Sequence, residues 1–149
     1  MVRDVCIFIL SVIVLLPSCQ ESLEDRCERE ARDFTAKKCP AKISETTIVD
    51  SLVFDKATLT MHYYYTMGGK GDDPEVIAEI NPRGALLEEV RNNIALGRYK
   101  EAGYNFSYTY FSLKNFGQEL FSVTFTPEDY NVPDSLIVIP ETTDSIPAT

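Results

Sequence analysis

Hydrophobic and polar residues follow two different periods along the chain, and the two periods alternate. Residues 22–38 place apolar side chains every three or four positions, as a helix with one buried side does, until Cys39 and Pro40 end the pattern. Residues 48–55 and 59–67 alternate one by one, which is typical of two strands joined by a short turn. The first half of the chain therefore predicts a helix followed by a β-hairpin.

The same order of elements returns in the second half. The expected apolar stripe of a helix over residues 82–96 consists of Leu86, Leu87, Val90 and Ile94. A shorter helix is expected before it at residues 74–80, and a turn after it at residues 97–103. Alternation then resumes in residues 104–111 and 120–126, which predict a second hairpin.

Two αββ units give the expected fold class, which is α+β. A four-stranded antiparallel sheet with both helices packed on one face would bury one side of every strand. Burial of apolar surface contributes about 25 cal/mol per Å², which is enough to drive such packing. We therefore expect one domain over residues 19–130 and a flexible tail over residues 131–149, which are rich in Thr, Pro and acidic residues.

Residues 1–18 have the pattern of a signal peptide. As a helix, the apolar run from Val5 to Leu16 would be about 18 Å long, too short for the roughly 30 Å hydrocarbon core of a bilayer. The segment that ends it, Leu16-Pro17-Ser18-Cys19, resembles the lipobox of bacterial lipoproteins. The resemblance implies cleavage between Ser18 and Cys19, a diacylglyceryl thioether on the Cys19 sulfur and an acyl group on the new amino terminus. Two or more acyl chains give stable anchoring.

A membrane is the first expected partner of the protein, and the lipid on Cys19 would hold the protein to it. Gln20 resembles the outer-membrane sorting signal of enterobacterial lipoproteins, and the acidic residues at 21, 24 and 25 resemble the surface-export signals of Bacteroidota lipoproteins. We therefore expect an exported chain anchored to the outer membrane, on either its periplasmic or its surface face. No cofactor other than the covalent lipid is expected.

The acidic composition narrows the range of partners. The chain has 23 acidic and 14 basic residues, a net charge of −9, and removal of residues 1–18 takes away one Arg and one Asp, which leaves the charge unchanged. Binding of nucleic acid requires clustered Lys and Arg, so the composition argues against nucleic acid as a partner. It also argues against contact between the protein surface and anionic lipids.

Candidate catalytic residues are scattered. His62, the single histidine, falls on the polar side of its strand, and no nucleophile motif accompanies it. Cys27 and Cys39 would lie about 18 Å apart on one continuous helix, beyond the ~7 Å that a disulfide allows, so we expect no bridge between them. No metal centre is predicted. An enzyme is the alternative hypothesis, and it is disfavoured because no two catalytic groups can be assigned to one site.

The glycine-rich segment 68–73 could suggest a phosphate-binding loop. Lys70 is followed by Gly71 and by two aspartates, which would repel phosphate, and the Ser or Thr of a Walker loop is missing. We interpret the segment as a flexible connection, with Asp72 or Asp73 capping the helix that begins at Pro74. Calcium binding by these aspartates and Glu75 is a minor alternative.

The tyrosine-rich strands are the most informative feature of the mature chain. Rows of aromatic side chains either pack under helices or stack on a sugar or a protein partner, and both interpretations stay open. If the second holds, Tyr64, Thr109 and Phe111 should be exposed together on the polar-facing side of the strands and form a ligand platform.

Four segments resemble a family of small uncharacterised lipoproteins from Bacteroidota-type gut bacteria. They are Cys39-Pro40, residues 47–55 (TIVDSLVFD), residues 63–66 (YYYT) and residues 124–130 (TFTPEDY). The resemblance covers most of residues 30–130 and implies no activity. We expect a lipid-anchored envelope protein that acts by binding, as a module of a larger assembly or as an inhibitor-like scaffold. Its partner would be an envelope protein or a glycan.

Overall fold

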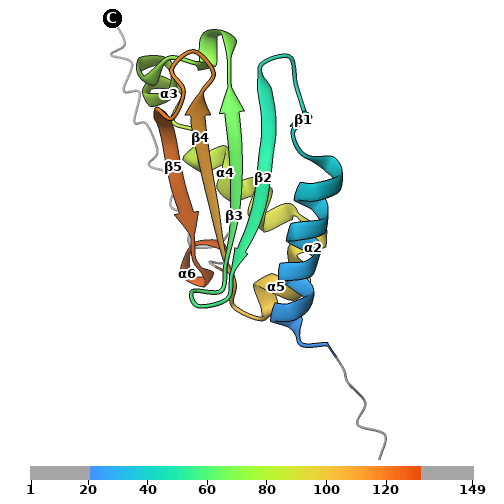
Figure 1. The fold of residues 1–149 in the computed structure, drawn as a ribbon. Coiled ribbons are helices and arrows are strands. Elements are labelled where there is room, and N and C mark those ends of the chain that lie inside the picture. Colours follow the sequence, from blue (N-terminus) through green and yellow to red (C-terminus); the bar gives the residue numbers. More distant parts are fainter. Residues whose placement is uncertain (1–20, 132–149) are drawn as a thin grey trace, which may run out of the picture.

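The computed structural model describes residues 21–131 of the chain (Figure 1). The predicted signal peptide, the cleavage site at Ser18 and Cys19, and the tail after Asn131 lie outside the described residues. The predictions for these segments therefore stay predictions.

A five-stranded sheet in the order β1-β2-β3-β4-β5 lies at the centre of the fold (Figure 1). Its β2–β3 and β4–β5 pairs are antiparallel, which confirms the two predicted hairpins and the α+β class. The strands are β1 (Ala41–Lys42), β2 (Thr47–Asp55), β3 (Thr60–Met67), β4 (Asn105–Ser112) and β5 (Glu119–Phe125).

The predicted sheet of four antiparallel strands is wrong in two details. β3 and β4 are parallel, with Thr60 beside Asn105 and Met67 beside Ser112. The helical segment between them returns the chain to the end of the sheet where β3 began, and such a crossover is the connection that a parallel pair requires. The additional strand, β1, has only two residues and is therefore too short to show an alternating pattern.

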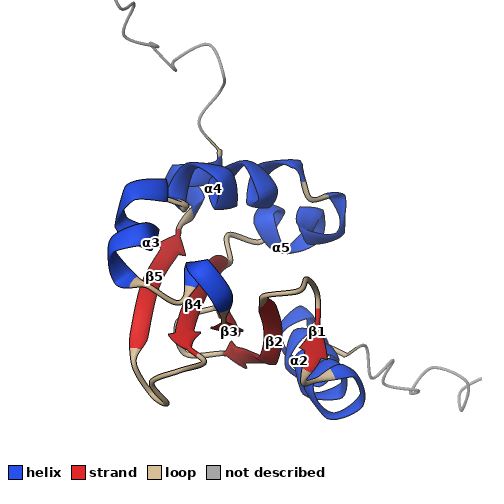
Figure 2. Ribbon diagram, turned by 90° about the horizontal axis from the view of Figure 1, so that it is seen from above, coloured by secondary structure: helices blue, strands red, loops and turns tan. Residues whose placement is uncertain are grey.

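Helices α3 (Pro74–Ile80), α4 (Arg83–Asn92) and α5 (Gly97–Glu101) form the crossover and cover one face of the sheet (Figure 2). The predicted helix over residues 82–96 is too long. Asn93 leaves the helical conformation, and its side chain accepts a hydrogen bond from the Ala95 N–H, which starts a short 3₁₀ turn. Ile94, expected in the apolar stripe, is therefore 93% exposed. The turn expected at residues 97–103 is mostly α5, which brings Tyr99 into the core.

The core lies between the sheet and these helices. Alternate residues of the central strands point into it, and the rings of Tyr63 and Tyr108 stack there with centroids 4.9 Å apart. After β5, the short helix α6 (Pro127–Tyr130) packs on α4, where Arg83 donates a hydrogen bond of 2.7 Å to the Asp129 carboxylate. The largest fully buried side chains are Cys27, Val90, Tyr104, Phe106 and Phe125.

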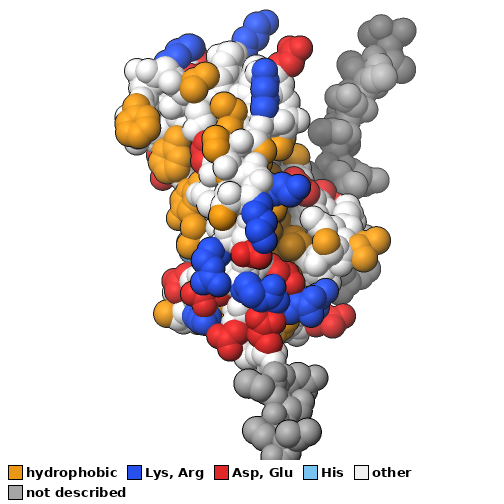
Figure 3. All heavy atoms as spheres, turned by 45° about the vertical axis from the view of Figure 1, so that its right-hand side comes forward, with side chains coloured by type: hydrophobic (Ala, Val, Ile, Leu, Met, Phe, Trp, Pro, Cys, Tyr) orange, Lys and Arg blue, Asp and Glu red, His pale blue; other side chains and the backbone are white. Residues whose placement is uncertain are grey.

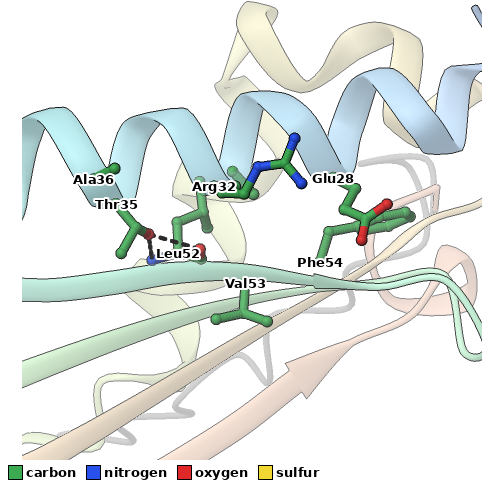
Figure 4. Close-up of a pocket in the computed structure, with 8 residues that line it drawn as sticks. Glu28, Arg32, Thr35, Ala36, Leu52, Val53 and Phe54 are labelled. Atoms are coloured by element: carbon green, nitrogen blue, oxygen red, sulfur yellow. Dashed lines mark hydrogen bonds between the residues drawn. The ribbon is translucent and has the colours of Figure 1, made fainter.

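Helix α2 (Leu23–Lys38) confirms the predicted first helix and its Ser22 cap. It lies along the β2 edge of the sheet, away from α3 and α4, so the prediction that both main helices share one face is wrong (Figures 1 and 2). Thr35 Oγ1 donates to the Leu52 carbonyl and accepts from the Leu52 N–H, each at 2.8 Å (Figure 4). The helix therefore satisfies backbone groups that an open sheet edge would leave unpaired. Cys27 and Cys39 are both free cysteines in this structure.

Candidate binding face of the sheet

The face of the sheet opposite α3, α4 and α5 carries no helix of the described part of the chain (Figure 2). We call it the open face. Its polar side chains pair across the strands, with Thr109 Oγ1 3.2 Å from Ser122 Oγ and Thr124 Oγ1 3.1 Å from Ser107 Oγ. The open face also carries His62, Tyr64, Thr66 and Phe111, which alternate with the core residues of β3 and β4.

A β-bulge adds a carboxylate to the open face. The β2–β3 register shifts between Val49 and Ser51, which leaves Asp50 as the additional residue. Strict alternation would place Asp50 on the same face as Leu52, in the core. The bulge turns it to the open face instead, where Asp50 Oδ2 accepts a hydrogen bond of 2.8 Å from Thr66 Oγ1.

Aromatic rings form an aligned row beside this carboxylate. The ring centroids of His62 and Tyr64 are 6.1 Å apart, with planes 9° from parallel. Those of Tyr64 and Phe111 are 6.4 Å apart, with planes at 20°. Phe116, in the turn between β4 and β5, is fully exposed at the end of the row. Apolar side chains of this size are usually buried, so their collection on an uncovered face indicates a contact surface.

The row borders a hollow of about 390 Å³, which we call the aromatic hollow. Three rings and one carboxylate lie in its wall, and no Lys or Arg does. Its lining residues are Asp50, Ser51, Tyr64, Thr66, Phe111, Ser112, Phe116 and Gly117.

The three residues predicted as a ligand platform lie on this face but differ in exposure. Tyr64 and Phe111 are half-buried and line the aromatic hollow. Thr109 is only 8% exposed and does not line it. The sequence pattern missed Asp50, because the bulge is not visible in the alternation. It also missed Phe116, because a turn residue belongs to no alternating set.

A second hollow, also about 390 Å³, lies between α2 and β2 (Figure 4). Its apolar floor includes Leu52 and Phe54, and Glu28 and Arg32 lie on its α2 side. Glu28 forms an ion pair with Lys56, so its charge is already matched. We interpret this hollow as the groove left where α2 packs on the sheet edge.

Charged side chains gather at the end of the molecule where α2 begins (Figure 3). Arg26 donates to Glu30 at 2.8 Å, and Lys56 donates to Asp25 at 2.8 Å. The hydrogen bond from Arg26, followed by one from the Tyr99 hydroxyl, lowers the pKa of Glu30. Exposed pairs of this kind contribute about 0–1 kcal/mol each. These charges satisfy one another, which distinguishes this end from the aromatic hollow.

The remaining candidate residues have structural roles. Asp73 accepts a hydrogen bond of 2.9 Å from the Glu75 N–H and caps α3. Asp72 is buried and accepts 2.8 Å from the Lys114 N–H, so the glycine-rich loop is tied to the β4–β5 turn instead of forming a free connection. Burial raises the pKa of the Cys27 thiol to about 12, which keeps it neutral. No group of three or more potential metal ligands occurs within residues 21–131.

A family model described as a domain of unknown function, DUF8479, matches residues 22–121. A crystal structure of a protein from Pseudomonas aeruginosa that is inferred to be secreted has a similar fold, with a TM-score of 0.60 and 13% identity. The match covers 71% of this chain and 90% of that chain. No curated protein matches the sequence significantly. None of the helices between residues 21 and 131 is long and apolar enough to cross a membrane.

Proposed function

The chain belongs to the DUF8479 family, a domain of unknown function, and we propose that it is a lipid-anchored envelope protein that binds a partner protein without catalysis. The open face of the sheet is the proposed binding surface. The observation that carries this proposal is the aromatic hollow, where Tyr64, Phe111 and Phe116 collect beside Asp50 on the open face. Aromatic side chains are enriched at the centres of protein interfaces.

The proposed anchor fits the position of the hollow. Only three residues separate Cys19 from Leu23, where α2 begins, so the lipid would hold this end of the domain within about 13 Å of the bilayer. Lys56, which bonds Asp25 near the start of α2, is six residues from Asp50 along β2, a distance of about 20 Å. The aromatic hollow would therefore lie about 20 Å from the end of the domain that is held near the membrane. Export is further supported by the P. aeruginosa protein of similar fold.

Mass spectrometry of the native polypeptide tests the anchor. We expect the chain to begin at Cys19 and to carry a diacylglyceryl group and an N-acyl group. A Cys19→Ala variant should keep its leader peptide and lose the lipid. A native chain with the leader attached, or with an unacylated amino terminus, would contradict the proposal.

Cross-linking in intact cells tests the binding surface. We expect the full-length chain to cross-link to an envelope protein. The Tyr64→Ser and Phe111→Ser variants should lose that product although thermal unfolding shows that they are folded at the temperature of the experiment. The matched control is Phe34→Ser, because Phe34 is an aromatic residue of α2 that is 40% exposed and lies off the open face. Equal loss in the control, or no loss in any variant, would contradict a role for the open face.

A glycan is the second candidate ligand, favoured by the exposed hydroxyl residues Ser122 and Thr124 of β5 on the open face. Hydroxyl side chains donate and accept hydrogen bonds, as sugar hydroxyls do. Binding of the purified chain to a glycan array, lost in Tyr64→Ser and kept in Phe34→Ser, would favour this candidate over a protein partner.

A further inference from the structure

We infer that the aromatic hollow receives an arginine side chain of the partner protein, with Asp50 as its counter-ion. This inference rests on the proposed function, because it names the group that the open face would bind. Its basis is one hollow that combines three aromatic rings with a carboxylate that has no ion-pair partner within residues 21–131.

The Asp50 carboxylate has hydrogen-bond acceptor positions that are not used within the described chain. Its one side-chain hydrogen bond within residues 21–131 is the one that Oδ2 accepts from Thr66, whereas an ionised carboxylate offers about four acceptor positions. The ion pairs of the described range lie elsewhere and do not include Asp50. Lys42, on the neighbouring strand β1, is exposed and also absent from those pairs. The Asp50 carboxylate therefore has no ion-pair partner within residues 21–131.

The surroundings strengthen the preference for a cation. Glu119 of β5 pairs with Phe111 and adds a second, exposed carboxylate next to the aromatic row. The faces of aromatic rings also attract cations. The chain as a whole carries a net charge of −9, which would increase the rate of encounter with a basic partner. A neutral sugar would gain little from these charges.

Arginine fits the hollow better than lysine does. Its planar guanidinium stacks on aromatic rings while its edge donates two parallel hydrogen bonds to a carboxylate. Tyr64, Phe111 and Phe116 supply the rings, and Asp50 supplies the carboxylate at the same hollow. A lysine ammonium could use the charge of Asp50, but it has no planar group to stack.

An NMR titration of the full-length chain in detergent micelles tests the inference. The probes are acetylated Gly-Arg-Gly amide, the same peptide with lysine, and the same peptide with citrulline, which has the shape of arginine without its charge. We expect saturable shifts at the Asp50, Ser51 and Gly117 amides with arginine, weaker binding of lysine and no binding of citrulline. Asp50→Asn should weaken arginine binding about tenfold. Glu45→Gln, which removes one exposed carboxylate outside the hollow, should leave it unchanged.

The melting temperature of Asp50→Asn shows whether the variant is folded. If it is not, Phe116→Ala takes its place, because the exposed Phe116 side chain can be removed without disturbing the core.

Equal binding of citrulline and arginine would overturn the inference, as would binding of N-acetylglucosamine that Asp50→Asn does not weaken. If no probe binds but cross-linking still depends on Tyr64 and Phe111, only the arginine assignment fails. If both experiments fail, the proposed binding face fails as well.

Discussion

Tyr63 and Tyr64 are neighbours in the chain, yet they belong to opposite faces of the sheet with different environments. Tyr63 stacks on Tyr108 under the crossover helices, and burial raises the pKa of both phenols well above the usual value. Tyr64 stands beside Phe111 on the open face and lines the aromatic hollow. The comparison shows that tyrosine packs in the core on one face and is available for contact on the other, because the helices α3, α4 and α5 of the described chain cover one face.

The largest expected difference between the two faces is in stability. Phe106 is fully buried in the covered face, so Phe106→Ala should lower the free energy of unfolding by about 3–5 kcal/mol through lost burial and the cavity it leaves. Urea denaturation followed by circular dichroism measures the change. A loss below about 1 kcal/mol would mean that the covered face is not the core of the domain.

Loss of the hydrogen bonds between α2 and the edge of the sheet should lower the free energy of unfolding by a smaller amount. Thr35→Val keeps the shape of the side chain but removes the hydroxyl that serves both backbone groups of Leu52, and we expect a loss of about 1–3 kcal/mol. Thr124→Val is the control, because Thr124 is an exposed residue of β5 whose hydroxyl donates to the Ser107 hydroxyl and bonds no backbone group. Similar losses in the two variants, measured by urea denaturation, would show that the Thr35 hydroxyl has no special role at the sheet edge.

Alkaline pH should lower the free energy of unfolding of the domain through titratable groups that are buried in its core. Burial raises the pKa of Cys27, Tyr104 and Tyr110 to about 12 in each case, so these groups lose protons at lower pH in the unfolded chain than in the folded one. Their contribution to stability is complete below about pH 8.5 and is lost as the pH rises through 12. Urea midpoints measured from pH 8 to pH 11 should fall steadily, and less steeply for Cys27→Ala. A flat profile would contradict the assignment of these groups to the core.

The smallest effect on stability is expected on the open face. Phe116→Ala should change the free energy of unfolding by less than about 0.5 kcal/mol, because the side chain is fully exposed. The same substitution should reduce the cross-linked product described above. Thermal unfolding together with cross-linking measures both effects, and a stability loss comparable to that of Phe106→Ala would remove the distinction between the two faces.

Local pattern was sufficient for the elements that depend on near neighbours. Ser22 and the spacing after it located α2, and Asp73 with Pro74 located α3. Alternation located both hairpins and assigned Tyr63 and Tyr64 to opposite faces. In each case the deciding interactions join residues close together in the chain or across one short turn, so the sequence contains the necessary information.

The features that define the candidate site depend on distant segments, and only the tertiary structure decided them. The β2–β3 register created the bulge that turned Asp50 outward, the crossover made β3 and β4 parallel, and α2 packed on the sheet edge through Thr35. The sequence determined that one side of each strand would be apolar. Which face the helices would cover, and which rings would be left beside an unpaired carboxylate, followed from packing between elements that no local pattern encodes.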